Sequence, residues 1–195
     1  MSKKTKTILS IVSLVLLLGG LILYWVVKAD DAKNAGLNFE TALTANLDSM
    51  AIVDSAYVWY ESRAELTHLM NDSIGIDSLA NVVNVFQHNY LSEKGDTLPE
   101  VYFFTNTKDT TMVETFKDFI VGDKDMKGDT IKVTFVEAFK IMRESAYEKP
   151  ESRHCVLRKE VGSKPANPQY IFGNDKAQIY VDAVTGAVSD INPAY

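Results

Sequence analysis

The feature that most constrains this chain is an uncharged run of 20 residues, from Ile8 to Val27, that is rich in Leu, Ile and Val. As a helix with a rise of about 1.5 Å per residue, the run extends roughly 30 Å, the thickness of the hydrocarbon core of a bilayer. A helix also satisfies all its backbone hydrogen bonds internally, as lipid requires. The run therefore predicts a single transmembrane helix over residues 8–27.

The charges around this run predict its orientation. Lys3, Lys4 and Lys6 precede it and no acid does, so the positive-inside rule makes residues 1–7 a cytoplasmic tail. We therefore expect the C-terminal region outside the cytoplasm. With the resemblances given below, the expected location is the bacterial inner membrane, with the C-terminal region in the periplasm. A cleaved signal peptide is the alternative, because Val27-Lys28-Ala29 places small residues where a signal peptidase reads them.

The composition argues against several classes of function. The 195 residues include 20 Lys and Arg against 26 Asp and Glu, and this net charge of −6 gives no support for nucleic-acid binding. The lone Cys155 excludes a disulfide scaffold, and its neighbour His154 would point to the opposite side of a strand. The loop that contains Asp123, Asp125 and Asp129 lacks the Glu ligand of a calcium loop. We predict no catalytic residue, no metal site and no cofactor.

Beyond the membrane segment, the chain divides into a tether and two folded parts. Residues 28–36 are polar and Ala-rich without an apolar period, which is typical of a tether. Residues 37–130 and 131–195 both show helical and strand patterns. The predicted fold class is α+β, with helices packed on an antiparallel sheet.

In the first part, spacings of three and four residues predict a helix over residues 37–70, although the aromatic run at 56–60 also fits a strand. A second helix is predicted from Asp77, a suitable N-cap, to Leu91. Strands are predicted at residues 101–104 and 112–121.

In the second part, Thr134 is a suitable N-cap for a helix that ends near Tyr147. Alternating apolar residues then predict strands at residues 155–161, 170–172, 178–182 and 187–190. Between the last two strands, a tight turn is predicted, because Asp and Thr side chains bond turn backbone and Gly accepts a positive φ. The residues expected to form this turn are Asp182, Thr185 and Gly186.

Residues 131–191 resemble a PepSY-type domain. The helix opens with Val136-Glu137-Ala138, and the ending from Tyr180 to Val188 contains Val-Asp-Ala-Val-Thr-Gly, both of which match the family pattern. The resemblance implies a PepSY/cystatin-like unit, a module that binds or regulates peptidases or cell-wall enzymes outside the cytoplasm. Residues 37–121 also place strands after a helix, so a repeated layout remains open.

The expected function is therefore that of a non-enzymatic envelope protein that binds and modulates another envelope protein. An accessory subunit of a larger membrane complex and a module that binds a small ligand are the alternatives. Exposed aromatic and basic residues are the expected partner surface. These residues are Trp59, Tyr60, Tyr102, Phe104, Arg153 and Arg158.

A tripeptide of Asp, then Ser or Thr, then an apolar residue or Thr occurs seven times, where chance predicts roughly one. It resembles the acceptor for O-glycosylation in the periplasm of one large group of Gram-negative bacteria, and a glycan there would be bulky and on the surface. Turn and cap pairs are the alternative explanation. The candidate acceptors are Ser49, Ser55, Ser73, Ser78, Thr97, Thr110 and Thr130.

Overall fold

The computed structural model of this chain describes residues 36–72, 79–121 and 124–195. Within these ranges, Leu37–Tyr195 is one compact unit. The predicted cytoplasmic tail, the predicted membrane helix and all but the last residue of the predicted tether lie outside the described residues. No helix of the described ranges is long and apolar enough to cross a membrane.

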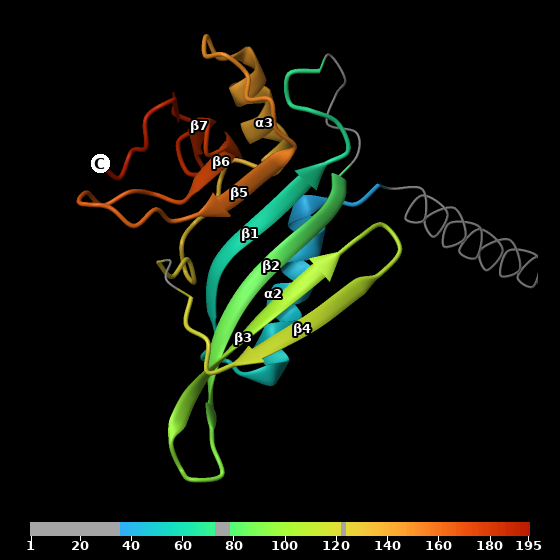
Figure 1. Ribbon diagram of the computed structural model, residues 1–195, viewed down its shortest axis with the longest axis vertical. Coiled ribbons are helices and arrows are strands. Elements are labelled where there is room, and N and C mark those ends of the chain that lie inside the picture. The colour runs from blue at the N-terminus through green and yellow to red at the C-terminus, as the bar shows by residue number, and fades with distance from the viewer. Residues whose placement is uncertain (1–35, 73–78, 122–123) are drawn as a thin grey trace, which may run out of the picture. The chain divides into compact units, whose positions relative to one another are not determined.

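The unit is an α+β fold, as predicted, with one antiparallel sheet of eight strands and two helices (Figure 1). The first half of the chain forms α2 (Phe39–Val53), β1 (Val58–Leu66), β2 (Leu79–Leu91), β3 (Thr97–Asn106) and β4 (Thr111–Lys117). The second half forms α3 (Phe135–Glu144), β5 (His154–Arg158), β6 (Gln169–Asn174), β7 (Ala177–Asp182) and β8 (Val188–Ser189).

The strands follow the order β4-β3-β2-β1-β5-β6-β7-β8 across the sheet. Each half contributes a helix followed by a meander of four strands, and the halves meet where β1 pairs antiparallel with β5. The same order of elements in both halves agrees with the repeated layout that the sequence left open. Because strand pairing is continuous from β4 to β8, both halves share one sheet.

Side-chain caps define where both helices begin. The Asn38 side chain accepts a hydrogen bond from the Thr41 N–H at 2.8 Å and so caps α2. The predicted cap Thr134 is confirmed, and with Glu137 it forms a capping box at the start of α3. Bonds from the Thr134 backbone and hydroxyl hold the pKa of Glu137 below its ordinary value.

The helix predicted over residues 37–70 is wrong beyond Val53, where α2 ends. Asp54 has an extended backbone, and strand β1 begins four residues later. β1 opens with Val-Trp-Tyr, and β-branched and aromatic side chains of this kind fit a pleated sheet better than a helix. The alternative prediction, that the aromatic run at 56–60 forms a strand, is therefore correct for residues 58–60, which belong to β1.

The helix predicted from Asp77 to Leu91 is also wrong, because residues 79–91 form strand β2. The proposed N-cap Asp77 lies outside the described residues. β2 has buried side chains on both of its faces: Val82 and Phe86 face the helices, whereas Val85 is buried on the other side. A strand that is buried on both faces does not show the simple alternation of apolar and polar residues. The spacing of apolar residues in β2 therefore fits a helix as well as a strand.

The C-terminal half agrees with the sequence predictions in its helix, its four strands and its last turn. The Asp182 carboxylate accepts the Val184 and Thr185 N–H groups at 2.8 Å each, and Gly186 has φ of 75°. Partial burial acts to raise the pKa of Asp182, but these bonds and one from Asn167 hold it below its ordinary value. The predicted turn at Asp182, Thr185 and Gly186 is therefore confirmed.

The buried apolar residues that the structure describes form a hydrophobic core between the sheet and the two helices. Phe39 of α2 stacks on Phe135 of α3, with ring centroids 4.9 Å apart, and both rings lie near Tyr170 of β6. The Glu40 carboxylate accepts a hydrogen bond from the Phe135 N–H at 2.5 Å. The start of α2 thus fixes the start of α3, so the halves are joined through their helices as well as their strands.

A buried polar network attaches α2 to β1, β2 and β3. Asn46 Oδ1 accepts hydrogen bonds from Nδ2 of Asn84 at 2.7 Å and of Asn106 at 2.8 Å. The Ser62 hydroxyl donates to Asn84 at 2.5 Å and accepts from Trp59 Nε1 at 3.2 Å. In the described part of the chain, every buried side-chain nitrogen and oxygen has a partner. Such a network selects one position of the helix on the sheet.

Candidate protein-interaction surface

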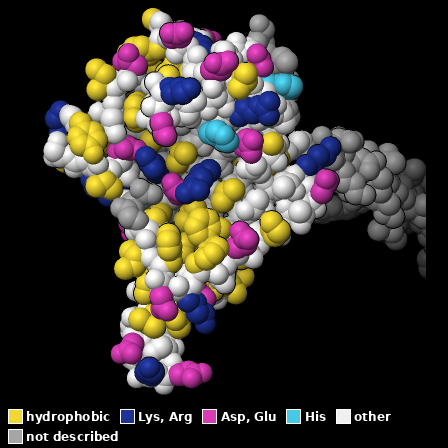
Figure 2. All heavy atoms as spheres, in the orientation of Figure 1, with side chains coloured by type: hydrophobic (Ala, Val, Ile, Leu, Met, Phe, Trp, Pro, Cys, Tyr) yellow, Lys and Arg dark blue, Asp and Glu magenta, His cyan; other side chains and the backbone are white. Residues whose placement is uncertain are grey.

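The two faces of the sheet differ in what covers them. Asn46 of α2 bonds to β2 and β3, and Phe139 of α3 packs against Phe172 of β6. The strand registers place all these contacts on one side of the sheet. We call the other side, on which none of the described helices packs, the open face. Figure 2 views the molecule from this side, with α2 behind the strands in Figure 1.

Two of the six residues predicted as a partner surface belong to the core instead. Trp59 is 5% exposed and Phe104 is 6% exposed. Both point toward the helices: Trp59 bonds to Ser62 across a register shift in β1, and Phe104 packs edge-on against Phe86. This part of the prediction is wrong, because a side chain under a helix cannot anchor a partner. Tyr60 lies at the register shift and is partly exposed.

The centre of the open face carries charges of both signs. Glu61 on β1 lies directly opposite Arg158 on β5. Glu61 accepts a hydrogen bond from Arg63 Nε at 2.6 Å, and Glu160 accepts one from Arg158 Nε at 2.8 Å. Both acids are buried, whereas Arg63 is exposed and Arg158 is half-buried. We call these four residues the charge cluster. Of the two arginines predicted for the partner surface, Arg158 belongs to this cluster, whereas Arg153 is exposed and lies directly before β5.

Exposed apolar side chains concentrate at one edge of the sheet. Among the described strands, β4 has a neighbour only on its β3 side, and all seven of its residues are exposed. Of the 12 exposed large hydrophobic side chains among the described residues, five lie within residues 112–120. We call these five the edge strip: Met112, Val113, Phe116, Phe119 and Ile120.

The segment after β4 extends this apolar surface over the open face. Asp118, with φ of 60°, ends β4, and its N–H donates to a carbonyl of β3 at 2.8 Å. The Val121 N–H then donates to the Gln87 side chain on β2 at 3.3 Å. The Phe116 ring packs edge-on against Phe103, with centroids 5.5 Å apart. Figure 2 shows hydrophobic side chains gathered over β2–β4, below a group of charged side chains.

This arrangement has the chemistry of a protein-interaction surface. Contiguous exposed apolar side chains beside charged groups are typical of interfaces, in which the apolar part is buried and the charges lie at the rim. A free strand edge also offers unpaired backbone N–H and C=O groups. The sequence predicted a strand here, but it contained no signal that this strand lies at the edge, because strand order depends on pairings distant in sequence.

A second polar cluster holds the end of α2 against β2 and β3. His88 lies between two carboxylates, with Nε2 3.0 Å from Glu100 Oε2 and Nδ1 3.5 Å from Asp54 Oδ2. The hydroxyl of Tyr102, a predicted partner residue, donates to Glu100 at 3.1 Å and so has a structural role. Burial acts to raise the pKa of Glu100, but bonds from His88 and Tyr102, together with Lys117, hold it below its ordinary value. The members of this second cluster come from the end of α2, from β2 and from β3. Because these segments are far apart in the chain, the sequence analysis did not predict the cluster.

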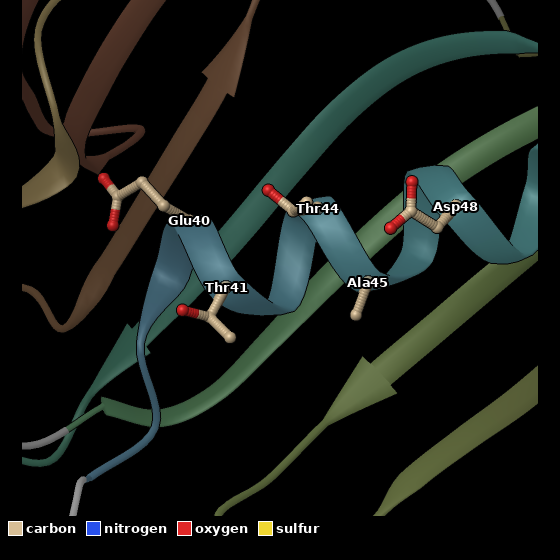
Figure 3. A pocket seen from close by; sticks show the side chains of 5 residues that line it. All are labelled: Glu40, Thr41, Thr44, Ala45 and Asp48. Atoms are coloured by element: carbon tan, nitrogen blue, oxygen red, sulfur yellow. The ribbon is translucent and has the colours of Figure 1, made fainter. Parts of the chain in front are cut away.

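The outer side of α2 carries a shallow depression of about 380 Å³ (Figure 3). Its lining residues lie on successive turns of one helix and do not converge: Glu40 points toward the C-terminal half, where it caps α3. In the ranges that the structure describes, no group of three or more His, Cys, Asp or Glu is placed to hold a metal ion. The depression is lined by Glu40, Thr41, Thr44, Ala45 and Asp48.

His154 and Cys155 point to opposite sides of β5. Cys155 is buried in the core, and burial raises the pKa of its thiol well above the ordinary value, whereas His154 is exposed on the open face. In the loop after β4, Asp125 accepts from the Lys127 N–H at 2.6 Å, and Asp129 pairs with Lys159 at 2.7 Å. Asp123 lies outside the described residues.

Five of the seven candidate glycosylation residues lie in the described ranges, and all five are exposed. Ser73 and Ser78 lie outside those ranges. A bulky glycan at any of the five would project into solvent. The five are Ser49 on α2, Ser55, Thr97 at the start of β3, Thr110 directly before β4, and Thr130.

Comparison of the chain with protein-family models, with curated proteins and with solved structures found no match. The edge strip, the charge cluster and the predicted membrane segment are therefore the features from which a function is inferred.

Proposed function

We propose that this chain is a non-enzymatic, single-pass protein of the bacterial inner membrane whose periplasmic region binds another envelope protein and modulates it. The edge strip is the observation that carries this proposal. Its five exposed apolar side chains follow one another within nine residues, at the end of the sheet where a seven-residue strand has a free edge. The charge cluster lies on the open face, as do Met112 and Phe116 of the edge strip, and supplies a polar border.

The energetics favour a partner over exposure to water. Complete burial of a Val, Ile, Met or Phe side chain stabilises a complex by roughly 1.5–3 kcal/mol before the costs of association are subtracted. Phe and Met are also enriched at the centres of interfaces relative to the remaining surface. We therefore expect Phe119 and Ile120, which are at least half exposed, to contribute strongly to partner binding.

The anchor and its orientation are part of the proposal and are supported by the uncharged run at residues 8–27 and the three lysines before it. The C-terminal half is proposed to be a PepSY-type unit. The capped helix α3, the four-strand meander and the turn at Asp182 support this assignment. The resemblance implies that the partner is an envelope peptidase or a cell-wall enzyme.

The proposal includes O-glycosylation of the periplasmic region, supported by the excess of the tripeptide and the exposure of its described hydroxyls. Protein purified from its native host is expected to have an intact mass above that of its sequence. Replacing the seven acceptors by Ala should remove the excess. An intact mass equal to the sequence mass would refute glycosylation while leaving partner binding intact.

Partner binding is tested by crosslinking in intact cells, followed by capture of the full chain and mass spectrometry. Ile120→Asp places a charge in the edge strip, and Ile191→Asp is the matched control, because Ile120 is 72% exposed and Ile191 is 71% exposed. We expect one dominant envelope enzyme with the unmodified chain and with Ile191→Asp, and at least a tenfold loss with Ile120→Asp, since one desolvated charge costs more than about 1.4 kcal/mol.

Equal capture by both variants would show that the edge strip is not the binding surface. Co-purification of several membrane subunits would instead support an accessory subunit of a larger complex. Turnover of a peptide or cell-wall substrate by the purified full chain would contradict the non-enzymatic assignment.

A further inference from the structure

We propose that a cavity between the starts of α2 and α3 binds an apolar α-amino acid, either free or as the N-terminal residue of a peptide. The apolar side chain of the ligand occupies the cavity, and its α-ammonium binds the Glu40 carboxylate. This site goes beyond the binding of a partner protein and uses no residue of the edge strip. We call it the helix-start cavity.

The walls of the helix-start cavity are apolar, and its volume is about 150 Å³. They come from α2, from the segment directly before α3, from β5 and from β6. The walls from β5 and β6 are buried, whereas Leu43 and the segment before α3 are partly exposed, so the cavity opens to solvent. The six apolar side chains are Phe39, Leu43, Ile131, Val133, Leu157 and Tyr170.

Contacts within the protein hold these walls in place. Phe39 and Leu43 are neighbours on one side of α2, because residues four apart lie one turn above each other. The Phe39 ring lies 6.1 Å from the Tyr170 ring, measured between centroids. The Tyr170 hydroxyl donates to the Val133 carbonyl at 2.9 Å and fixes the segment before α3. The cavity is therefore formed without a ligand, as most small-molecule sites are.

The volume of the cavity limits the size of the group that it accepts. Apolar cavities of about 150 Å³ bind molecules of the size of benzene. The side chains of Leu, Ile and Phe are of similar size, and their transfer from water into an apolar site is favourable. The helix-start cavity therefore fits one apolar side chain and is too small for a lipid chain.

Glu40 supplies the charge that recognises an ammonium group. Its Oε1 accepts the Phe135 N–H at 2.5 Å, and Figure 3 shows the side chain pointing from α2 toward the C-terminal half. A carboxylate accepts about four hydrogen bonds, so acceptor sites remain for a ligand. Burial, and then the Glu40 charge, raise the pKa of the Tyr170 hydroxyl. A negative charge that disfavours a phenolate in this wall favours a bound cation.

Lys132 is the basic residue in the lining of the cavity. It is exposed, and among the described residues its ammonium has no ion-pair partner. A free apolar amino acid carries an ammonium, a carboxylate and an apolar side chain on one carbon, and an acid and a base beside one apolar cavity match these three groups. In a peptide, the N-terminal residue keeps its ammonium but its carboxylate becomes a neutral amide. The two sources therefore differ in their dependence on Lys132.

Isothermal titration calorimetry of the full chain in lipid nanodiscs tests the site, with empty nanodiscs as the blank. The probes are L-phenylalanine and a Phe-Ala-Ala peptide with a free N-terminus. L-alanine lacks the large side chain and N-acetyl-L-phenylalanine lacks the ammonium, so these two compounds are the controls. We expect at least one probe to bind about tenfold or more tightly than both controls, because each control loses one recognised group.

Glu40→Gln removes the charge but keeps an oxygen that can accept the Phe135 N–H. Asp48→Asn is the matched control, because it makes the same change further along α2, outside the cavity. We expect Glu40→Gln to weaken probe binding about tenfold or more, and Asp48→Asn to leave it unchanged. Leu43→Trp fills the opening and should abolish binding. Urea unfolding of each variant without probe verifies that it is folded.

Lys132→Gln distinguishes the two sources of the ligand. Tighter binding of L-phenylalanine, weakened by Lys132→Gln, would assign the site to a free amino acid. Tighter binding of Phe-Ala-Ala, unchanged by Lys132→Gln, would assign it to a peptide N-terminus.

Absence of binding by both probes would overturn the proposal, as would equal affinities of Glu40→Gln and Asp48→Asn. Binding of N-acetyl-L-phenylalanine as tight as that of L-phenylalanine would overturn it as well. Partner capture with Ile120→Asp and Ile191→Asp is a separate measurement. Failure of the helix-start cavity and failure of partner binding are therefore distinguishable.

Discussion

At the scale of single residues, polar side chains decide where the backbone turns. The Asp182 carboxylate accepts two backbone N–H groups and the Asn167 amide, and these bonds close the turn before β8. They also hold the pKa of Asp182 below its ordinary value, against the effect of partial burial. A group with a lowered folded-state pKa stabilises the fold when it is ionised.

Asp182→Ala is expected to destabilise the folded unit, Leu37–Tyr195, by about 1–2 kcal/mol at pH 7, because two turn N–H groups lose their acceptor. The contribution of Asp182 is lost as pH falls from about 4 through its lower folded-state pKa. As pH falls through this interval, the free energy of unfolding should therefore decrease less for Asp182→Ala than for the unmodified protein. Urea denaturation at several pH values measures both effects, with the exposed Asp190→Ala as control.

The Asn46 amide illustrates a second residue-scale effect, the cost of leaving buried donors unpaired. Asn46→Ala removes the acceptor of Asn84 and one acceptor of Asn106 in a buried site. We expect a loss of about 2–3 kcal/mol in the free energy of unfolding. Thr44→Ala, on the exposed side of the same helix, should change it by less than about 0.5 kcal/mol. Similar values for the two variants would show that the network contributes little.

At the scale of elements, local caps determine where helices begin. The hydroxyl of Thr134 accepts the Glu137 N–H, and the Glu137 carboxylate accepts the Thr134 N–H. This reciprocal pair aligns the start of α3 beside Phe39 and Tyr170. The start of α3 is therefore determined both by its own capping residues and by the aromatic residues that pack against it.

Thr134→Ala should destabilise α3 by about 1 kcal/mol, since it removes a side-chain cap. Thr134→Ser keeps the hydroxyl and should restore most of this stability. Thermal and urea unfolding provide the measurement, and Thr130→Ala, an exposed position before the helix, is the control. A Ser variant as unstable as the Ala variant would mean that the cap is not the cause.

At the scale of the whole molecule, the two halves form one sheet over one core. Phe39 carries much of this connection, because its ring contacts Phe135 and Tyr170, which both belong to the other half. If the halves fold as one cooperative unit, a cavity at this residue weakens both of them equally. If they fold separately, only the first half is weakened.

Phe39→Ala is expected to cost about 3–5 kcal/mol and to keep a single unfolding transition. Amide hydrogen exchange should accelerate in β2 and in β6 by similar factors. Leu91→Ala, a substitution of an exposed residue at the end of β2, should change neither. Faster exchange confined to β2 would contradict one cooperative unit.

Local sequence predicted the parts of the fold that depend on neighbouring residues. The α+β class, the helix after Thr134, the four C-terminal strands and the turn at Asp182 all follow from caps, turn residues and clear alternation. The prediction failed for β1 and β2. In β2, apolar side chains are buried on both faces, so the period of the sequence did not distinguish strand from helix.

Local sequence was sufficient to predict the turn at Asp182, the start of the helix at Thr134 and the apolar run at residues 8–27, but not the break after Val53. The burial of Trp59 and Phe104, and the exposure of five apolar side chains within residues 112–120, are seen only in the folded chain. Exposure depends on strand order and on the face that the helices cover. Both are set by contacts between residues far apart in the chain, which no local pattern records.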